Sequence, residues 1–283
     1  MKLCRFGQPG TEKPGLIDGD GKLRDLSSVV ADIGPGTLSE ESLVRLAALD
    51  SSTLPRVESE VRFGVPWTGI SKYVGIGLNY ADHAAEAGLE LPSEPIIFLK
   101  ANSAICGPND DTLMLPSMSK LDWEVELGVV IGRTARVIGE EEAQAHIAGY
   151  CLLNDVSERA FQLQSSQWDK GKGCDTFGPV GPWLVTKDEI PDPQALALQL
   201  DVNGVRRQDG TTANMIFGVN ALVAYVSRYM TLLPGDVIAT GTPSGVAMGM
   251  KPSAQWLRAG DVVELRISGL GAQRQVIVSQ SAR

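Results

Sequence analysis

Two glutamates separated by one residue, Glu124 and Glu126, lie in the most informative stretch of the sequence, residues 122–132. In a β-strand, residues two positions apart point to the same face, so these carboxylates would project side by side, opposite Val125 and Leu127. Like charges at that distance repel each other unless a positive group lies between them, and a divalent cation meets this need. The alternative is a solvent-facing strip of an amphipathic strand, and the Glu-x-Glu spacing alone leaves that alternative open.

A third carboxylate favours the metal site. Asp155 follows the apolar run Tyr150–Asn154, so we expect it at the end of a strand, where sheets present ligands. Three carboxylates would supply oxygens of an octahedral shell and leave positions for water and a chelating substrate. The chain has only 2 histidines, so oxygen ligands must dominate, which favours Mg²⁺ or Mn²⁺ over zinc. Arg159 and Gln162 follow Asp155 at helical spacing, and all three side chains could therefore face one site.

A histidine and a glutamate are the candidate general base. His83 and Glu86 are three residues apart on a predicted helix, Ala81–Glu86, so their side chains can touch. A carboxylate beside an imidazole orients the ring and raises its basicity, which suits activation of water. A purely structural histidine is the alternative. The helix has only alanines as apolar residues, so we expect low local stability and a lid that closes on substrate.

Two lysines and one turn are further candidates for binding anions. Lys100 ends the apolar run Ile96–Lys100, and Lys172 lies in a glycine-rich segment, residues 170–173, that could either bind an anionic substrate group or form a solvated loop. Residues 238–245 place a strand before a turn with exposed backbone N–H groups and hydroxyls, which is typical of an anion nest.

Composition excludes several classes of function. The chain of 283 residues carries 25 lysines and arginines against 34 aspartates and glutamates, a formal net charge of −9. Such a surface repels phosphate backbones and anionic lipids, so we expect no nucleic-acid and no membrane partner. No apolar stretch approaches the roughly 20 residues that span a bilayer, and the first residues lack the apolar core of a secretory signal. These features predict a cytoplasmic globular protein.

The first 66 residues are predicted to form a small N-terminal β-rich domain and a linker. Short extended segments are expected at Lys2–Phe6, Pro14–Asp18 and Lys22–Asp25, followed by a helix over Leu38–Leu49. The segment Ser51–Pro66 is polar, contains two prolines and reads as a linker.

Residues 67–283 are predicted to form an α+β catalytic domain. Helices are expected over Ala81–Glu86, Gly139–Ile147 and Met215–Met230, and the strands do not alternate regularly with them. A mixed or antiparallel sheet is therefore favoured over a doubly wound parallel one. The predicted strands are Tyr73–Leu78, Ile96–Lys100, Trp123–Ile131, Tyr150–Val156, Trp183–Thr186, Leu198–Val202, Asp236–Thr240 and Val262–Ile267.

Five segments, in order, resemble the fumarylacetoacetate hydrolase family. The resemblance extends over roughly residues 73–267. The segments are Gly77-Leu78-Asn79-Tyr80-Ala81-Asp82-His83, Ile97-Phe98-Leu99-Lys100, Glu124-Val125-Glu126-Leu127-Gly128, Asn154-Asp155-Val156-Ser157-Glu158-Arg159 and Gly241-Thr242-Pro243-Ser244-Gly245. This resemblance implies a mixed β-roll catalytic fold, a homodimer, and a magnesium or manganese ion held by three carboxylates.

By motif position, the resemblance assigns a role to each candidate residue. It implies that Glu124, Glu126 and Asp155 are the metal ligands. The implied catalytic residues are His83 and Glu86, as a water-activating dyad on a lid, and Lys172, which meets the substrate. The implied substrate-binding residues are Arg159, Gln162 and Thr242, and we count Tyr80 and Lys100, within the same matching segments, as further candidates.

The N-terminal pattern is similar to a bacterial subgroup labelled either ureidoglycolate lyase or 2,4-diketo-3-deoxy-L-fuconate hydrolase. The leading function is hydrolysis of a carbon–carbon bond in a 2,4-diketo acid, either an acylpyruvate or such a sugar acid, with release of pyruvate. Oxaloacetate decarboxylation, keto–enol isomerisation and ureidoglycolate cleavage are alternatives on the same scaffold. A metal-dependent keto-acid binding protein is the non-enzymatic alternative, although simple chelation has no use for a base.

Overall fold

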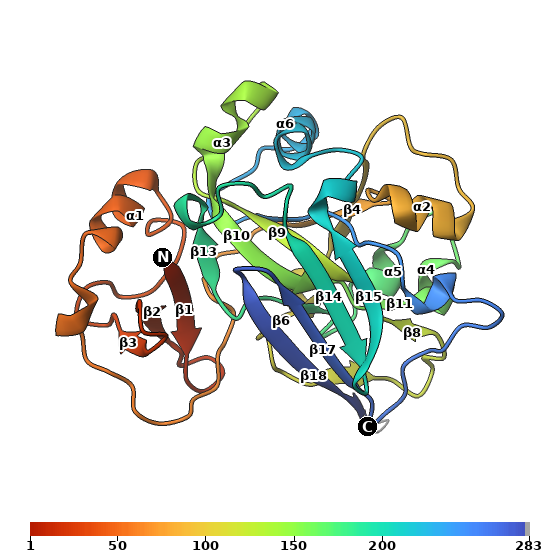
Figure 1. Ribbon diagram of the computed structural model, residues 1–283, viewed down its shortest axis with the longest axis horizontal. Coiled ribbons are helices and arrows are strands. Elements are labelled where there is room, and N and C mark those ends of the chain that lie inside the picture. The colour runs from red at the N-terminus through yellow and green to blue at the C-terminus, as the bar shows by residue number, and fades with distance from the viewer. Residues whose placement is uncertain (281–283) are drawn as a thin grey trace.

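A mixed sheet of nine strands forms the centre of the computed structural model, which describes residues 1–280 (Figure 1). The order across the sheet is β3-β2-β1-β13-β10-β9-β16-β4-β5. Strand β16 runs parallel to β4, whereas β9 and β10 are antiparallel. In chain order the strands are β1 (Lys2–Phe6), β2 (Lys13–Ile17), β3 (Leu23–Asp25), β4 (Tyr73–Gly77), β5 (Ile96–Lys100), β9 (Val125–Ile131), β10 (Ile147–Asn154), β13 (Leu184–Thr186) and β16 (Val237–Ala239). The predicted α+β fold with a mixed sheet is confirmed.

A second sheet of five strands packs against the first, in the order β15-β14-β17-β18-β7. Its strands are β7 (Thr112–Met114), β14 (Ala197–Val202), β15 (Val205–Thr211), β17 (Val262–Ile267) and β18 (Gly271–Ser279). Side chains of β9, such as Leu127, share one apolar core with Leu198 and Leu265 of the second sheet. Two short ladders join β8 (Leu121–Asp122) to β11 (Ser157–Glu158) and β6 (Ile105–Cys106) to β12 (Gly178–Pro179).

Six α-helices lie among the described residues and surround the two sheets (Figure 1). They are α1 (Glu40–Ala47), α2 (Ala81–Ala87), α3 (Ala143–His146), α4 (Arg159–Gln162), α5 (Asp169–Lys172) and α6 (Val219–Tyr229). Helix α6 buries Val219, Leu222 and Val226 on one face, as its spacing predicts. Within residues 1–280, no helix is long and apolar enough to cross a membrane.

The N-terminal strands extend the nine-stranded sheet. Strand β1 pairs antiparallel with β13, so that Leu3 lies opposite Leu184. Leu3 and Leu46 of α1 belong to a second apolar core, which also contains Val130 of β9. Ser39 caps α1 by accepting the N–H of Ser42. The first 66 residues therefore cover one face of the nine-stranded sheet. The same sheet contains β9, the strand of the Glu-x-Glu segment.

The predicted boundary between a helix and a strand near residues 147–150 is wrong, because the strand begins earlier than expected. The helix expected over Gly139–Ile147 is a 3₁₀ turn at Glu140–Glu142 followed by the short α3, and Ile147 already begins β10. The strand expected from Tyr150 therefore starts three residues earlier, since a fully buried β10 pairs with β9 along its length. Burial against both cores outweighs the local helical pattern.

Candidate active site

The register between β9 and β10 brings the three predicted metal ligands together. Leu153 pairs with Glu126, and the N–H of Asp155 donates to the carbonyl oxygen of Glu124 at 2.9 Å. Asp155 therefore lies across from Glu124, with Glu126 two residues along on the same face. Oxygen atoms of the three carboxylates lie within 4.8 Å of one another, and all three residues are buried. The alternative of a solvent-facing strip is wrong.

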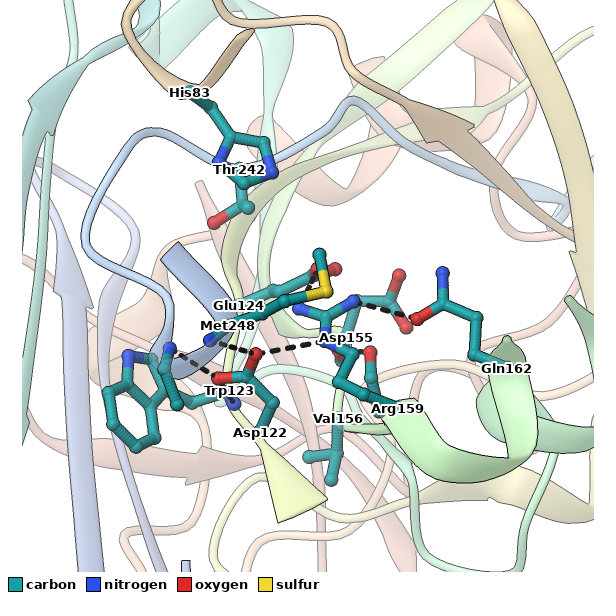
Figure 2. A network of polar contacts seen from close by, with 12 residues as sticks. His83, Asp122, Trp123, Glu124, Asp155, Val156, Arg159, Gln162, Thr242 and Met248 are labelled. Carbon is teal, nitrogen blue, oxygen red and sulfur yellow. Dashed lines mark hydrogen bonds and ion pairs between the residues drawn. The ribbon is translucent and has the colours of Figure 1, made fainter. Parts of the chain in front are cut away.

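Cations contact two of these three carboxylates, and Figure 2 shows one of them, Arg159, beside Glu124. The Nζ of Lys172 lies 2.6 Å from Glu124 Oε2 and 2.6 Å from Asp155 Oδ2. Arg159 Nη2 donates to Glu124 Oε1 at 2.5 Å, and Lys100 donates to Asp155 Oδ1. Glu126 accepts the backbone N–H of Gly241 at 2.8 Å, and within residues 1–280 it makes no ion pair.

The electrostatics of the cluster leave a place for a cation. Burial raises the pKa of Glu126 well above its usual range, and the charges of Asp155 and Glu124 raise it further. Burial also acts on Glu124, but the positive charges of Arg159 and Lys172 prevail and lower its pKa to about 2. Three buried carboxylates with oxygen donors fit a hard divalent ion such as Mg²⁺ or Mn²⁺.

Asp122, which the sequence analysis did not identify, positions Arg159. Its Oδ2 accepts Arg159 Nε at 2.9 Å, and its two carboxylate oxygens also accept the N–H groups of Ala247 and Met248. Arg159 Nη1 donates to Gln162 Oε1 at 2.9 Å. The helical spacing from Asp155 to Gln162 is interrupted, because β11 intervenes and α4 begins only at Arg159, but Arg159 and Gln162 still lie together beside Glu124.

Lys172 lies at the end of a helix, so the alternative of a solvated loop is wrong. It is the last residue of α5 and is 2% exposed. Gly171 allows α5 to contact α4, because a Cβ at this position would lie 2.5 Å from the backbone nitrogen of Gln162. Although burial lowers the pKa of Lys172, the charges of Asp155 and Glu124 prevail and raise it, so the side chain remains an ammonium group.

His83 lines the candidate cavity and lies on the far side of Thr242 from the carboxylates in Figure 2, and Glu86 contacts its ring. His83 Nδ1 lies 3.2 Å from Glu86 Oε2. Glu86 Oε1 accepts the N–H of Gly245 at 3.0 Å, and Ser244 Oγ donates to Asp82 Oδ2 at 3.3 Å. Helix α2 is therefore attached to the loop after β16 by a few polar contacts, and it positions an imidazole over the carboxylates.

One cavity of about 170 Å³ unites most of the predicted site. Its polar lining consists of His83, Glu124, Glu126, Arg159, Gln162, Lys172 and Thr242. Lys100 does not line it, because its ammonium is enclosed by Asp155 and the carbonyl oxygen of Val156. Tyr80 does not line it either: its side chain is fully buried in the core, and its hydroxyl makes no hydrogen bond in the described structure.

Comparison with known proteins assigns the family. The family model for the C-terminal part of fumarylacetoacetate (FAA) hydrolase matches residues 72–278. The chain belongs to the fumarylacetoacetate hydrolase family. A provisionally named hydrolase of Burkholderia multivorans is 56% identical to it over 277 residues, which is 98% of each chain.

Solved structures in this family have the same fold over the whole chain. The fumarylacetoacetate hydrolase of Exiguobacterium antarcticum is 35% identical, with a TM-score of 0.85 over 99% of this chain and 100% of its own. The 5-carboxymethyl-2-hydroxymuconate delta-isomerase of Mycobacterium smegmatis is 33% identical, with a TM-score of 0.79 over 100% of each chain. Family members of this fold are thus enzymes, hydrolases in some cases and isomerases in others.

The turn after β16 has a different role in this family member from the predicted anion nest. Gly241 has a φ of 96°, a conformation that favours glycine, and its N–H points at Glu126. Thr242 Oγ1 donates to the carbonyl oxygen of Val125 at 2.8 Å and accepts a bond from Gln208. The turn therefore holds a carboxylate of the protein itself.

Magnesium affinity is expected to rise with pH through the raised pKa of Glu126. Below that pKa the carboxyl holds a proton that the cation must displace, and above it the carboxylate is free. The stability of the metal-free protein should change with pH in the opposite direction. Protonated Glu126 contributes to its free energy of unfolding at low pH, and this contribution is lost as the pH rises through the raised pKa. Calorimetric titration with MgCl₂ in two buffers of different ionisation enthalpy measures the proton release. Affinity without pH dependence, and without proton release, would contradict the ligand role.

Helix α2 is expected to exchange its amide hydrogens quickly in the free protein and more slowly when the site is filled. It has seven residues and no side-chain cap at its N-terminus, so its local stability is low. Hydrogen exchange is measured with and without magnesium plus oxalate, a pyruvate-enolate mimic, and α6 serves as an internal reference. Equal protection of α2 in both states would rule out a closing lid.

Proposed function

We propose that this protein is a metal-dependent hydrolase that cleaves a carbon–carbon bond in a 2,4-diketo acid and releases pyruvate. The observation that carries this proposal is the cavity that His83, Glu124 and Glu126 line together. Among residues 1–280, the buried carboxylate of Glu126 makes no ion pair, and His83 is in contact with Glu86. Glu124, Glu126 and Asp155 would hold Mg²⁺ or Mn²⁺, which when bound stabilises the negative charge that develops on the substrate.

His83 would act as the general base. Glu86 accepts a bond from Nδ1–H and so leaves Nε2 free to take a proton from water. The water oxygen forms a bond to C4 of the diketo acid, and the bond between C3 and C4 breaks with its electron pair remaining on C3. The resulting pyruvate enolate takes the proton back at C3, and the second product is the carboxylic acid of the acyl group.

Lys172 and Arg159 would act on the anionic end of the substrate. Both are buried cations that line the cavity beside the carboxylates. The carboxylate and keto oxygens of a keto acid need positive partners there. Gln162 is held through Oε1, so its amide nitrogen can donate a hydrogen bond, and Thr242 lies on the same wall. We also propose that the protein is a homodimer, which sedimentation would test.

The test is release of pyruvate from an acylpyruvate. We expect turnover with magnesium present and loss of that turnover when EDTA is added. A protein that binds the keto acid without consuming it would instead be the non-enzymatic binding protein. Pyruvate release unaffected by removal of the metal would overturn the metal-dependent mechanism.

Other reactions on this scaffold are distinguished by their products. The similarity to a muconate isomerase favours isomerisation as the second candidate, which would change the ultraviolet spectrum of the substrate without releasing pyruvate. Oxaloacetate decarboxylation releases carbon dioxide, and ureidoglycolate cleavage releases urea. The subgroup suggested by the N-terminal pattern predicts 2,4-diketo-3-deoxy-L-fuconate as substrate, and the same product screen includes it.

A further inference from the structure

The candidate cavity has two chemically different ends. The inner end contains the carboxylates and cations described above, whereas the outer end is lined mainly by apolar side chains. Its residues are Leu78, Leu89, Phe98, Leu163, Trp168 and Met248. The proposed reaction uses none of these side chains. They would instead contact the acyl group of the substrate, which lies beyond the diketo group.

The aromatic wall of the outer end is fixed by two glycines of β4. Gly75 pairs with Phe98 across the β4–β5 ladder, and its missing side chain makes room for that ring. At Gly77 a Cβ would lie 2.5 Å from the ring of Trp168. The rings of Phe98 and Trp168 have centroids 5.5 Å apart, so they form one continuous surface.

Three apolar side chains at the mouth are unusually exposed. Leu89 is 51% exposed, Leu163 64% and Met248 40%, and all three line the same cavity. They come from three separate segments, after α2, after α4 and after β16. An apolar group that enters the cavity would remove this surface from water, which is favourable in proportion to the area covered.

A second charge on the substrate would find no partner at this end. The cations of the cavity lining are Arg159 and Lys172; both are paired with buried carboxylates, and the ammonium of Lys172 also lies 5.0 Å from the centroid of the Phe98 ring. Lys170, nearby in the sequence, donates to Gln164 and does not line the cavity. A distal carboxylate or a row of hydroxyls would therefore lose its water without a compensating contact.

We propose that the acyl group of the preferred substrate is a short, uncharged, apolar chain or ring, selected by Leu163, Trp168 and Met248. This inference rests on the proposed hydrolase function and narrows its substrate class away from sugar acids and dicarboxylates. The size of the cavity agrees, since its total volume of about 170 Å³ must hold the pyruvate end of the substrate as well as the acyl group, which leaves room for a short acyl group only.

The test compares kcat/KM among diketo acids that share the pyruvate end. From acetylpyruvate through propanoylpyruvate to butanoylpyruvate, we expect an increase of about two- to fourfold for each methylene buried. Fumarylpyruvate and 2,4-diketo-3-deoxy-L-fuconate should be cleaved at least about 100-fold less efficiently than butanoylpyruvate.

A substitution at the mouth of the cavity provides a second test, which does not depend only on how the wild-type protein ranks its substrates. Leu163→Lys places a cation at an exposed position, so kcat/KM for fumarylpyruvate relative to butanoylpyruvate should rise at least about tenfold. Val44→Lys is the matched control, because Val44 is 63% exposed on α1, away from this cavity.

The two proposals fail in different ways. If the wild-type protein cleaves fumarylpyruvate or the sugar acid as efficiently as butanoylpyruvate, or if Leu163→Lys leaves the ratio unchanged, the apolar assignment is overturned and the hydrolase function stands. If no diketo acid yields pyruvate, the hydrolase function is overturned and the assignment fails with it.

Discussion

Replacing His83 by alanine is expected to lower acylpyruvate cleavage by about 10²–10⁴-fold, while any oxaloacetate decarboxylation falls by less than about tenfold. Hydrolysis requires a group that takes a proton from water, and His83 is the imidazole that lines the cavity with Glu124 and Glu126. Decarboxylation needs stabilisation of charge on the enolate but no attacking water. The two activities therefore separate the role of a base from the role of the metal site.

His146→Ala is the matched control for this variant. His146 is 8% exposed against 7% for His83, and it lies on α3, hydrogen-bonded to the carbonyl oxygen of Arg133 and outside the cavity. Both activities are measured on one preparation at saturating magnesium, so that loss of metal is not mistaken for loss of the base. An equally large loss of both would assign His83 a structural or substrate-holding role. A wild-type protein that decarboxylates oxaloacetate but cleaves no diketo acid would favour the decarboxylase.

Replacing Glu126 by glutamine is expected to weaken magnesium binding by at least about 100-fold without weakening the fold. Changes in residues that only support a ligand already cost about 10–100-fold in metal affinity, and here a charged ligand is lost. Glutamine keeps an oxygen for the N–H of Gly241 and removes the charge that Asp155 and Glu124 repel. The metal-free variant should therefore melt at or above the temperature of the wild type.

Glu158→Gln provides the comparison for the Glu126 variant. Glu158 is fully buried near Asp155, but its oxygens accept the N–H groups of Lys120 and Ala160 and it lies outside the carboxylate cluster. Calorimetry with MgCl₂ and thermal unfolding of the metal-free protein are run on both variants. Unchanged magnesium affinity in Glu126→Gln would eliminate the three-carboxylate site, and an equal loss in Glu158→Gln would show that the effect is not specific to Glu126.

The carboxylate cluster could be predicted because its geometry is mostly local. The Glu-x-Glu spacing places Glu124 and Glu126 on one face, and the apolar run before Asp155 marks the end of a strand. Only the register was missing: periodicity predicts β9 and β10 but not that Leu153 lies opposite Glu126. Register depends on both cores at once, which no short window of sequence contains.

The supporting residues could not be predicted, since their partners are distant in sequence. Asp122 is recognisable only once Arg159 and the N–H of Ala247 reach it, over separations of 37 and 125 residues. Lys172 is predicted as a site residue, but the helix that carries it is not, because glycines beside a lysine favour a loop, whereas here Gly171 allows two short helices to touch. Tyr80 shows the converse: it lies within a matching segment, but its side chain packs into the core.

The pairing of β1 with β13 affects any attempt to shorten the chain. Without its first 66 residues, β13 would become an open edge with unpaired N–H and C=O groups. The apolar side chains of Val130, Cys151 and Leu153, now covered in the second core, would lie beside that edge. Such a surface recruits strands from other molecules, so a truncated protein that keeps every carboxylate of the site would tend to aggregate. Heating the intact chain should correspondingly give one cooperative transition.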